Sequence, residues 1–263
     1  MTDAADPRPP LDSGRLAPYG VEVVARAGST NALVADRARD GANAWLVVVT
    51  EHQTAGRGRL DRTWETPDRA ALTFSTLLRP TRAGIEWPWL PLVAGIAVVG
   101  ALREHGVPAG LKWPNDVMVD GADGQSRKLA GILAERVETP NGPAAVVGIG
   151  LNVSQTAGEL PVETATSISL TTGAPTDRTA LLVSLLTRLR QEYDAWSAGG
   201  GARVRGDYVE ACTTLGRGVR VSLPGGDELT GEATDVDDTG RLVVAGTPVA
   251  AGDVLHVRPS QMS

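Results

Sequence analysis

The chain has 263 residues and a formal net charge of -6 at pH 7. A general nucleic-acid binder needs a broad basic face to displace counterions, so this charge argues against that class. The composition, 42% apolar and 21% charged, is that of an ordinary globular protein with enough length for one large domain and a small second one.

The single cysteine, Cys212, excludes an intrachain disulfide and favours the reducing cytoplasm as the compartment. Residues 1–19 carry acids and prolines where a signal peptide has a basic start and an apolar run, so we expect a flexible N-terminal segment. The most apolar stretch, residues 90–102, is shorter than the roughly 18 residues of a membrane span. It is predicted to be a buried helix, and no membrane association is expected.

The first elements alternate between strand and helix. Residues 21–41 begin as a strand and turn helical, with a helix cap in the Ser-Thr-Asn run at 29–31. Residues 45–53 form a β-branched run typical of a buried strand, and residues 71–80 alternate like a second strand. A loop rich in glycine and arginine joins these two strands.

The middle of the chain predicts a helix over residues 91–106 and then three strands separated by Gly, Asn and Asp turns. These strands cover residues 111–120, 127–137 and 144–154 and are expected to form a meander. From residue 176 leucines recur three and four apart, which predicts an amphipathic helix that ends at a run of glycines.

The last part of the chain consists of a short helix over residues 202–214 and then short strands with hairpin turns. We place the domain boundary near Leu215, which gives a main domain over 20–214 and a small one over 215–263. A segment of this size is too short for a large core, so a small β-barrel that leans on the main domain is expected.

The loop sequence GRGRLDR places Arg57, Arg59 and Arg62 beside Gly56 and Gly58. Such a loop is either a solvated surface segment or one that orders around an anion, because glycines allow close backbone approach and guanidinium groups match phosphate and carboxylate oxygens. The chain contains neither a Walker A loop nor a GxGxxG turn that opens a helix, which disfavours a kinase-like or Rossmann nucleotide site.

Three further segments place polar side chains at turns or within apolar runs. In KWPND a turn holds Lys112 and Asp116 close together, although an ordinary strand end fits equally well. In RKLAGILAE, Lys128 precedes an apolar run, where an inward ammonium needs an anion and an outward one is unremarkable. In GIGLN, Asn152 is either a turn amide or a ligand-facing amide.

The motifs GSTN, EHQTAGRGRLDRTW, KWPND, RKLAGILAE and GIGLN occur in this order, and through them the chain resembles the biotin protein ligases. The resemblance covers roughly residues 20–260. It implies an α+β fold, with a mixed central sheet flanked by helices (the class II synthetase-like biotin/lipoate ligase fold) and a C-terminal SH3-like barrel. It also implies an enzyme that joins biotin to ATP, forms biotinyl-5'-AMP, and transfers biotin to a lysine of a biotin carboxyl carrier protein.

The resemblance also implies roles for individual residues. The catalytic group is Lys128, Arg57, Arg59 and Asp116. The biotin-binding group is Ser29, Thr30, Asn31, Gln53, Arg57, Gly58, Arg59, Lys128 and Gly131. The ATP-binding group is Arg59, Arg62, Trp64, Lys112, Asn115, Asp116, Lys128 and Asn152. Mg²⁺ is expected with ATP, and Asp116 is a possible metal ligand, an orienting partner of Lys128 or a proton acceptor.

Some features depart from the family pattern or leave alternatives open. Leu60 and Asp61 replace a basic or glycine-containing turn, and Asp61 weakens the positive charge of the loop. No winged DNA-binding domain precedes the catalytic domain, so DNA binding is not expected. A lipoate or octanoate ligase and a non-catalytic biotin or nucleotide sensor are the alternative functions, and the protein is either a monomer or a homodimer.

Overall fold

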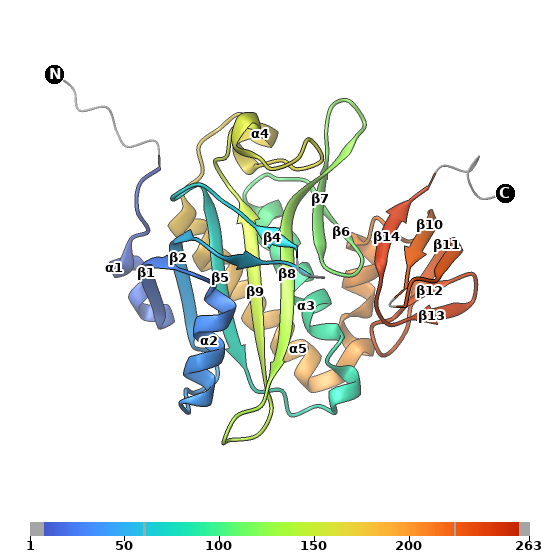
Figure 1. Cartoon of the computed structure of the whole chain (residues 1–263), viewed down its shortest axis with the longest axis horizontal. Coiled ribbons are helices and arrows are strands. Elements are labelled where there is room, and N and C mark those ends of the chain that lie inside the picture. The colour runs from blue at the N-terminus through green and yellow to red at the C-terminus, as the bar shows by residue number, and fades with distance from the viewer. Residues whose placement is uncertain (1–7, 60–61, 224, 258–263) are drawn as a thin grey trace.

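A seven-stranded mixed sheet forms the centre of the larger domain (Figure 1), in the order β1-β2-β5-β9-β8-β7-β6. The computed structural model describes residues 8–59, 62–223 and 225–257. The strands are β1 (Val21–Ala27), β2 (Val47–Gln53), β5 (Ala71–Leu78), β6 (Ala109–Lys112), β7 (Asp116–Asp120), β8 (Ser126–Val137) and β9 (Ala144–Asn152). Strands β1 and β2 pair in parallel, and the other neighbours in this sheet are antiparallel. The predicted mixed sheet is confirmed, including the meander from β6 to β9.

Helices cover both faces of this sheet. Helix α2 (Thr30–Arg39) lies on the face that Figure 1 presents to the viewer, against β2 and β5, while α3 (Trp89–Glu104) and α5 (Arg178–Ala211) lie behind it. Because α3 is packed between the sheet and α5, it is apolar on nearly all sides, and twelve of its residues are buried. The prediction of a buried helix in this region is confirmed.

Helix α5 includes both helices that the sequence predicts after residue 176. The helical backbone is interrupted at Gly200, where φ is 67° and ψ is -163°. A residue with a side chain is strained at such a φ, so the glycine run allows the break between the two helical parts. The start of α5 is capped by the Asp177 carboxylate, which accepts from the backbone N–H groups of Thr179 and Ala180.

The described part of the N-terminal segment is packed on the domain, in contrast to the flexible segment that we expected over residues 1–19. Leu11 and Leu16 are buried, and Leu16 belongs to the short helix α1 (Ser13–Leu16). Arg178 donates to Pro9 O at 2.7 Å and pairs with Glu51 at 2.8 Å. Two apolar side chains and a buried guanidinium therefore fasten this segment, which composition alone does not reveal.

The smaller domain is one five-stranded antiparallel sheet in the order β13-β12-β11-β10-β14. Its strands are β10 (Gly218–Ser222), β11 (Glu228–Val236), β12 (Leu242–Val244), β13 (Thr247–Val249) and β14 (Asp253–His256). No pairing between β13 and β14 closes the sheet within the described residues, so the expected barrel is not a closed one. The indole N–H groups of Trp89 and Trp113 donate to carbonyls of this domain, at Asp238 and Gly240.

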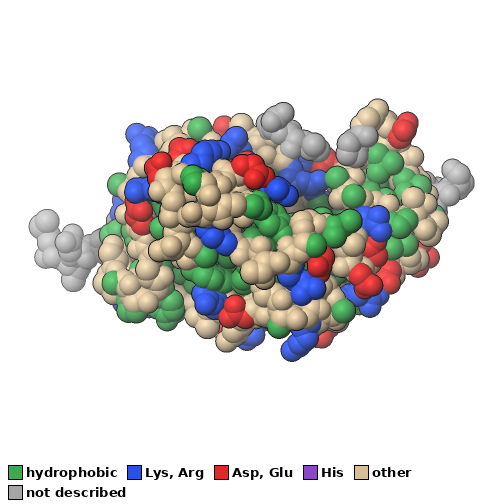
Figure 2. Space-filling view, turned by 90° about the horizontal axis from the view of Figure 1, so that it is seen from below, with side chains coloured by type: hydrophobic (Ala, Val, Ile, Leu, Met, Phe, Trp, Pro, Cys, Tyr) green, Lys and Arg blue, Asp and Glu red, His purple; other side chains and the backbone are tan. Residues whose placement is uncertain are grey.

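On the face drawn in Figure 2, described Lys and Arg side chains are interspersed with Asp and Glu rather than collected in one basic patch.

Three shorter elements lie at the site or near it: the hairpin strands β3 (Gly56–Arg57) and β4 (Thr63–Trp64), and helix α4 (Ile168–Thr172). None of the helices in the described ranges combines the length and the hydropathy that crossing a bilayer requires.

Candidate active site

A cavity of about 670 Å³ lies between the sheet, the β3–β4 hairpin and β14. This volume is within the usual range for small-molecule sites, roughly 300–1,000 Å³. All but one of the site residues predicted from the sequence line it: Ser29, Asn31, Gln53, Arg57, Gly58, Arg59, Arg62, Trp64, Lys112, Asn115, Asp116, Lys128, Gly131 and Asn152. Segments that are far apart in the sequence thus meet at one place.

Thr30 is the exception, because it is not among the lining residues. It is buried, and its backbone N–H donates to the Gln53 side-chain oxygen at 2.9 Å. Its hydroxyl lies 3.3 Å from the same oxygen. Thr30 therefore orients Gln53 from below the cavity surface, while Gln53 itself lines the cavity.

Two glycines of β9 form part of the cavity floor. Side chains alternate along a strand, so Gly148, Gly150 and Asn152 share one face of β9. A Cβ on Gly148 would overlap with Asn31 Oδ1, and a Cβ on Gly150 would lie 2.5 Å from the Trp64 ring. Bare backbone at these positions is what allows Asn31 and Trp64 to lie against the sheet.

A β-bulge brings Lys128 to the cavity side of the sheet. Lys128 and Gly131 are three residues apart on β8, which would place them on opposite faces of a regular strand. The register between β7 and β8 shifts, however, so that Met118 pairs with Lys128 while Val117 pairs with Ala130. The extra residue, Leu129, is buried in the main core, and Lys128 reaches the same side as Gly131.

The Lys128 ammonium lies between an anion and an aromatic ring. Its Nζ is 2.6 Å from Asp116 Oδ1 and 5.8 Å from the centroid of the Trp64 ring. Lys112 is the register partner of Asp116 in the ladder between β6 and β7. Burial lowers the pKa of Lys112, and the nearby Asp116 carboxylate opposes this effect. One carboxylate therefore forms an ion pair with Lys128 and also favours the charged form of Lys112, so two ammonium groups share a single nearby anion.

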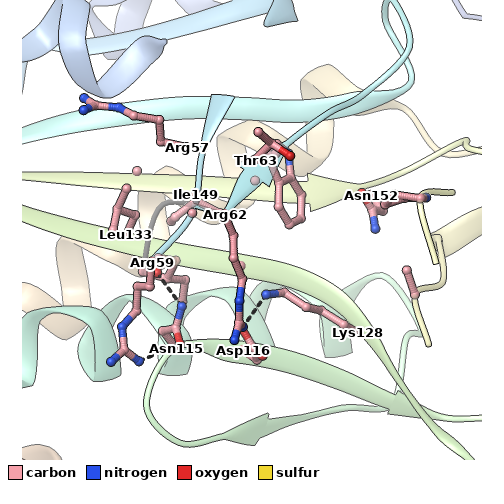
Figure 3. A pocket seen from close by; sticks show the side chains of 18 of the residues that line it. Arg57, Arg59, Arg62, Thr63, Asn115, Asp116, Lys128, Leu133, Ile149 and Asn152 are labelled. Carbon is pink, nitrogen blue, oxygen red and sulfur yellow. Dashed lines mark hydrogen bonds and ion pairs between the residues drawn. The ribbon is translucent and has the colours of Figure 1, made fainter. Parts of the chain in front are cut away.

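The three loop arginines do not point the same way. Figure 3 shows the Arg59 and Arg62 side chains directed toward Asn115 and Asp116, whereas the Arg57 guanidinium points away from them. Arg59 donates to Asn115 Oδ1 at 3.1 Å, and burial lowers its pKa. Arg57 lies 3.8 Å from Glu135 in an exposed pair. Leu60 and Asp61 lie outside the described residues, so their effect on the loop stays a prediction.

The Asn152 amide is occupied by its own chain. It donates to Thr166 O at 2.9 Å and accepts from Gln155 Nε2 at 2.8 Å. These bonds hold the segment over residues 155–166, and part of that segment forms a wall of the cavity. This geometry favours a supporting role for Asn152, and its contact with a nucleotide stays a prediction.

Some lining residues escaped the sequence reasoning. Asp253 of β14 lines the cavity and forms an ion pair with Arg62, and Arg59 lies 3.5 Å from Gly252 O. The residues around position 253 carry no local pattern that marks a site, since only the packing of the small domain brings β14 to the loop. Glu65 and parts of the segment 161–165 also line the cavity, and their local sequence likewise carries no pattern that marks a site.

The described residues do not form a metal site made by protein groups alone. Within the described ranges, no three His, Cys, Asp or Glu side chains are grouped so that they could hold a metal ion. Asp116, the possible metal ligand, is already paired with Lys128. A divalent ion at this cavity would therefore need ligands from a bound substrate.

The mixed sheet, the flanking helices and the basic cavity define a protein of the biotin and lipoate ligase class. Residues 23–152 match the Biotin/lipoate A/B protein ligase family, and residues 214–257 match the Biotin protein ligase C terminal domain. Within this class, the chain belongs to the biotin protein ligase family.

Individual relatives support this membership. The chain is 40% identical to the biotin--[acetyl-CoA-carboxylase] ligase of Mycobacterium tuberculosis, over 98% of this chain and 100% of that protein. It is 30% identical to the ligase of the same name from Paracoccus denitrificans, over 85% and 93% of the two chains. Among solved structures, the biotin protein ligase from Aquifex aeolicus in complex with biotin and ATP matches with a TM-score of 0.76 and 28% identity, covering 91% and 99%.

Proposed function

We propose that this protein is an ATP-dependent ligase that activates biotin as biotinyl-5'-AMP and transfers it to a lysine of a biotin carboxyl carrier protein. The names of the relatives with 40% and 30% identity support this proposal. The single observation that carries it is that Arg59, Arg62 and Lys128 line one cavity, although the chain as a whole has a net charge of -6. Positive charge is concentrated where two anionic substrates must meet.

In the first step, a carboxylate oxygen of biotin attacks the α-phosphorus of ATP, and the bond to the leaving pyrophosphate breaks. Both reactants are anions, so cationic groups must offset their repulsion and stabilise the charge that grows on the phosphate oxygens. Lys128 is suited to this role because Asp116 and Trp64 hold its ammonium in place before any ligand arrives. Arg59 and Arg62 supply guanidinium donors directed toward Asn115 and Asp116 (Figure 3).

In the second step, the amine of the carrier lysine attacks the acyl carbon of biotinyl-5'-AMP, an amide bond forms, and AMP leaves. The amine has a reference pKa near 10.4, so it must lose a proton to become nucleophilic at neutral pH. Asp116 is the carboxylate paired with Lys128, and it either accepts this proton or only orients Lys128. Asp116→Asn removes both the base and the ion pair to Lys128, so the two half-reactions separate the roles: loss of the transfer step alone would indicate a proton acceptor, and equal loss of both steps an orienting residue.

The biotin head group is assigned to the end of the cavity formed by the start of α2. Ser29, Asn31 and Gln53 offer hydroxyl and amide groups there, which match the donors and the acceptor of the ureido ring. Trp64 is assigned to the nucleotide side, where its ring provides a flat surface. Gly58 and Gly131 allow close approach of the loop and of β8 to the substrate.

Mg²⁺ is proposed to arrive with ATP as part of the nucleotide substrate. Mg²⁺ usually keeps several waters and binds one or two carboxylates together with substrate phosphates. This agrees with the absence, within the described ranges, of a grouped set of protein ligands. We also propose a cytoplasmic location, on the basis of the single cysteine, and either a monomer or a homodimer.

The decisive experiment mixes the protein with ATP, Mg²⁺, biotin and a carrier domain. Mass spectrometry of the carrier is expected to show the addition of one biotin, with biotin-dependent release of pyrophosphate. Lipoate and octanoate serve as competing acids. Their transfer in place of biotin would identify the protein as a lipoate or octanoate ligase. Biotin binding without pyrophosphate release would identify a sensor and refute the proposed enzyme.

A further inference from the structure

The Asn31 side chain is already fully occupied as a donor before any ligand binds. Asn31 is 5% exposed and lines the cavity. Its Nδ2 donates to Glu135 Oε2 at 2.6 Å and to Leu133 O at 3.3 Å, while Ser75 Oγ lies 2.6 Å from its Oδ1. An asparagine amide has two N–H donors and two acceptor positions, so only one acceptor position on Oδ1 remains for a ligand.

The backbone beneath Asn31 leaves its amide little freedom. A Cβ on Gly148 would overlap with Oδ1, so the amide lies directly against the bare strand β9. The strongest bond that fixes its orientation is the one to Glu135, because a hydrogen bond to a carboxylate is about twice as strong as one between neutral groups. Glu135 therefore determines which way the Asn31 carbonyl oxygen is presented.

Glu135 acts from outside the cavity surface. It is on β8, its side chain is 35% exposed, and it is not among the residues that line the cavity. Its second oxygen lies 3.8 Å from an Arg57 nitrogen, but Arg57 is 56% exposed, and exposed pairs of this kind contribute little. The bond to Asn31 is thus the stronger of the two contacts through which Glu135 reaches the binding site.

We propose that Glu135 is a positioning residue for acid recognition, which holds the Asn31 amide so that Oδ1 accepts a hydrogen bond from an N–H of the biotin ureido ring. This inference rests on the proposed function and deepens it. In this proposal, Asn31 contacts biotin only as a hydrogen-bond acceptor. It also assigns to Glu135 an effect on biotin binding that does not extend to ATP.

The test compares Glu135→Ala and Glu135→Gln with the parental protein in two measurements, the Kd for biotin by calorimetry and the KM for ATP in pyrophosphate release. Glu135→Ala is expected to raise the Kd for biotin by about 10-fold, the effect of one lost hydrogen bond to a charged group. Glu135→Gln keeps an oxygen that accepts from Asn31 Nδ2, so its Kd is expected to rise by only about 3-fold. The KM for ATP is expected to stay within about 2-fold in both variants.

Glu22→Ala is the matched control. Glu22 has a similar exposure of 36%, is also on a strand of the main sheet, and pairs with Arg37 at 3.0 Å away from the cavity. Its removal is expected to leave both constants unchanged. A Glu135→Ala protein with an unchanged Kd for biotin, or with equal losses for biotin and ATP, would overturn the proposal.

A double-mutant cycle with Asn31→Ala separates positioning from general stabilisation. If Glu135 acts through Asn31, then Glu135→Ala has no further effect on the Kd for biotin once Asn31 is alanine. Independent effects of the two substitutions would contradict the inference. A parental protein that binds biotin but forms no biotinyl-5'-AMP would refute the proposed enzyme alone, whereas one that binds no biotin would overturn both.

Discussion

Gly150→Ala is the substitution that most directly tests the packing of the cavity floor. The new Cβ would lie 2.5 Å from Cε2 and 2.7 Å from Nε1 of Trp64, well inside contact distance. The backbone of Gly150 cannot move away, because β9 is paired with β5 through Thr73 and with β8 through Gly131. The Trp64 ring must therefore shift, and it leaves its place beside Lys128.

The expected cost falls on activity more than on stability. Overpacking a rigid core costs roughly 1–3 kcal/mol, but Trp64 is half-buried on a two-residue strand and can swing outward, so a loss of about 1 kcal/mol is expected. Displacement of a positioning group by about 1 Å can reduce a rate on the order of 100-fold. Biotin-dependent pyrophosphate release is therefore expected to fall by about 10-fold to 100-fold.

The assay pairs urea unfolding with initial rates of pyrophosphate release. Gly206→Ala is the matched control, since Gly206 lies in α5, away from the cavity, and a Cβ added there would meet no atom within 4 Å. Alanine there is expected to raise the free energy of unfolding by roughly 0.5–1 kcal/mol and to leave the rate unchanged. A Gly150→Ala protein with the parental rate would show that Trp64 does not need to lie on β9, and would refute the reasoning.

Three further substitutions test other parts of the structure. Lys128→Ala is expected to slow formation of biotinyl-5'-AMP on the order of 100-fold to 1,000-fold, and a parental rate would remove Lys128 from the mechanism. Glu51→Ala leaves the buried Arg178 guanidinium without its carboxylate, so urea unfolding should show a loss of about 3 kcal/mol; a loss under about 1 kcal/mol would contradict the role of this pair. Burial lowers the pKa of His256 from 6.5 to about 4. The unfolded chain therefore binds a proton at a higher pH than the folded protein does. The stability that the neutral imidazole contributes is complete above pH 6.5 and is lost as the pH falls toward 4. With a discount for its partial exposure, His256→Gln should reduce the loss of unfolding free energy between pH 7 and pH 4 by about 1 kcal/mol, and equal losses in both proteins would contradict this.

Much of the fold follows from local pattern, because consecutive elements are neighbours in space. The β-branched run at 45–53 contains β2, and the three runs between 111 and 154 form one meander from β6 to β9. What local pattern does not contain is tertiary burial. The strand β5 is buried on both faces, although its sequence was expected to alternate. The packing of residues 8–19 likewise depends on Arg178, which is distant in the sequence.

For the candidate site, the sequence predicts which residue types take part but not the direction in which their side chains point. The motifs identify which segments carry guanidinium, ammonium and amide groups, and all of these segments reach one cavity. They do not determine where each group points. Lys128 faces the cavity only because Leu129 is an extra residue in β8, and no sequence rule for strand alternation predicts a bulge there.

The same argument explains why two anionic residues at and beside the site, Asp253 and Glu135, were not predicted from the sequence, although Asp116 was. A cation in an apolar run attracts attention, because it requires a partner. Its partner does not, because an acid at a strand end or in a turn is common on any surface. Asp253 and Glu135 both lie in ordinary positions of the sequence and gain their significance only from contacts with Arg62 and Asn31. We therefore expect that removing either carboxylate alters the ligand contacts of its partner, while the same change at Glu22 does not.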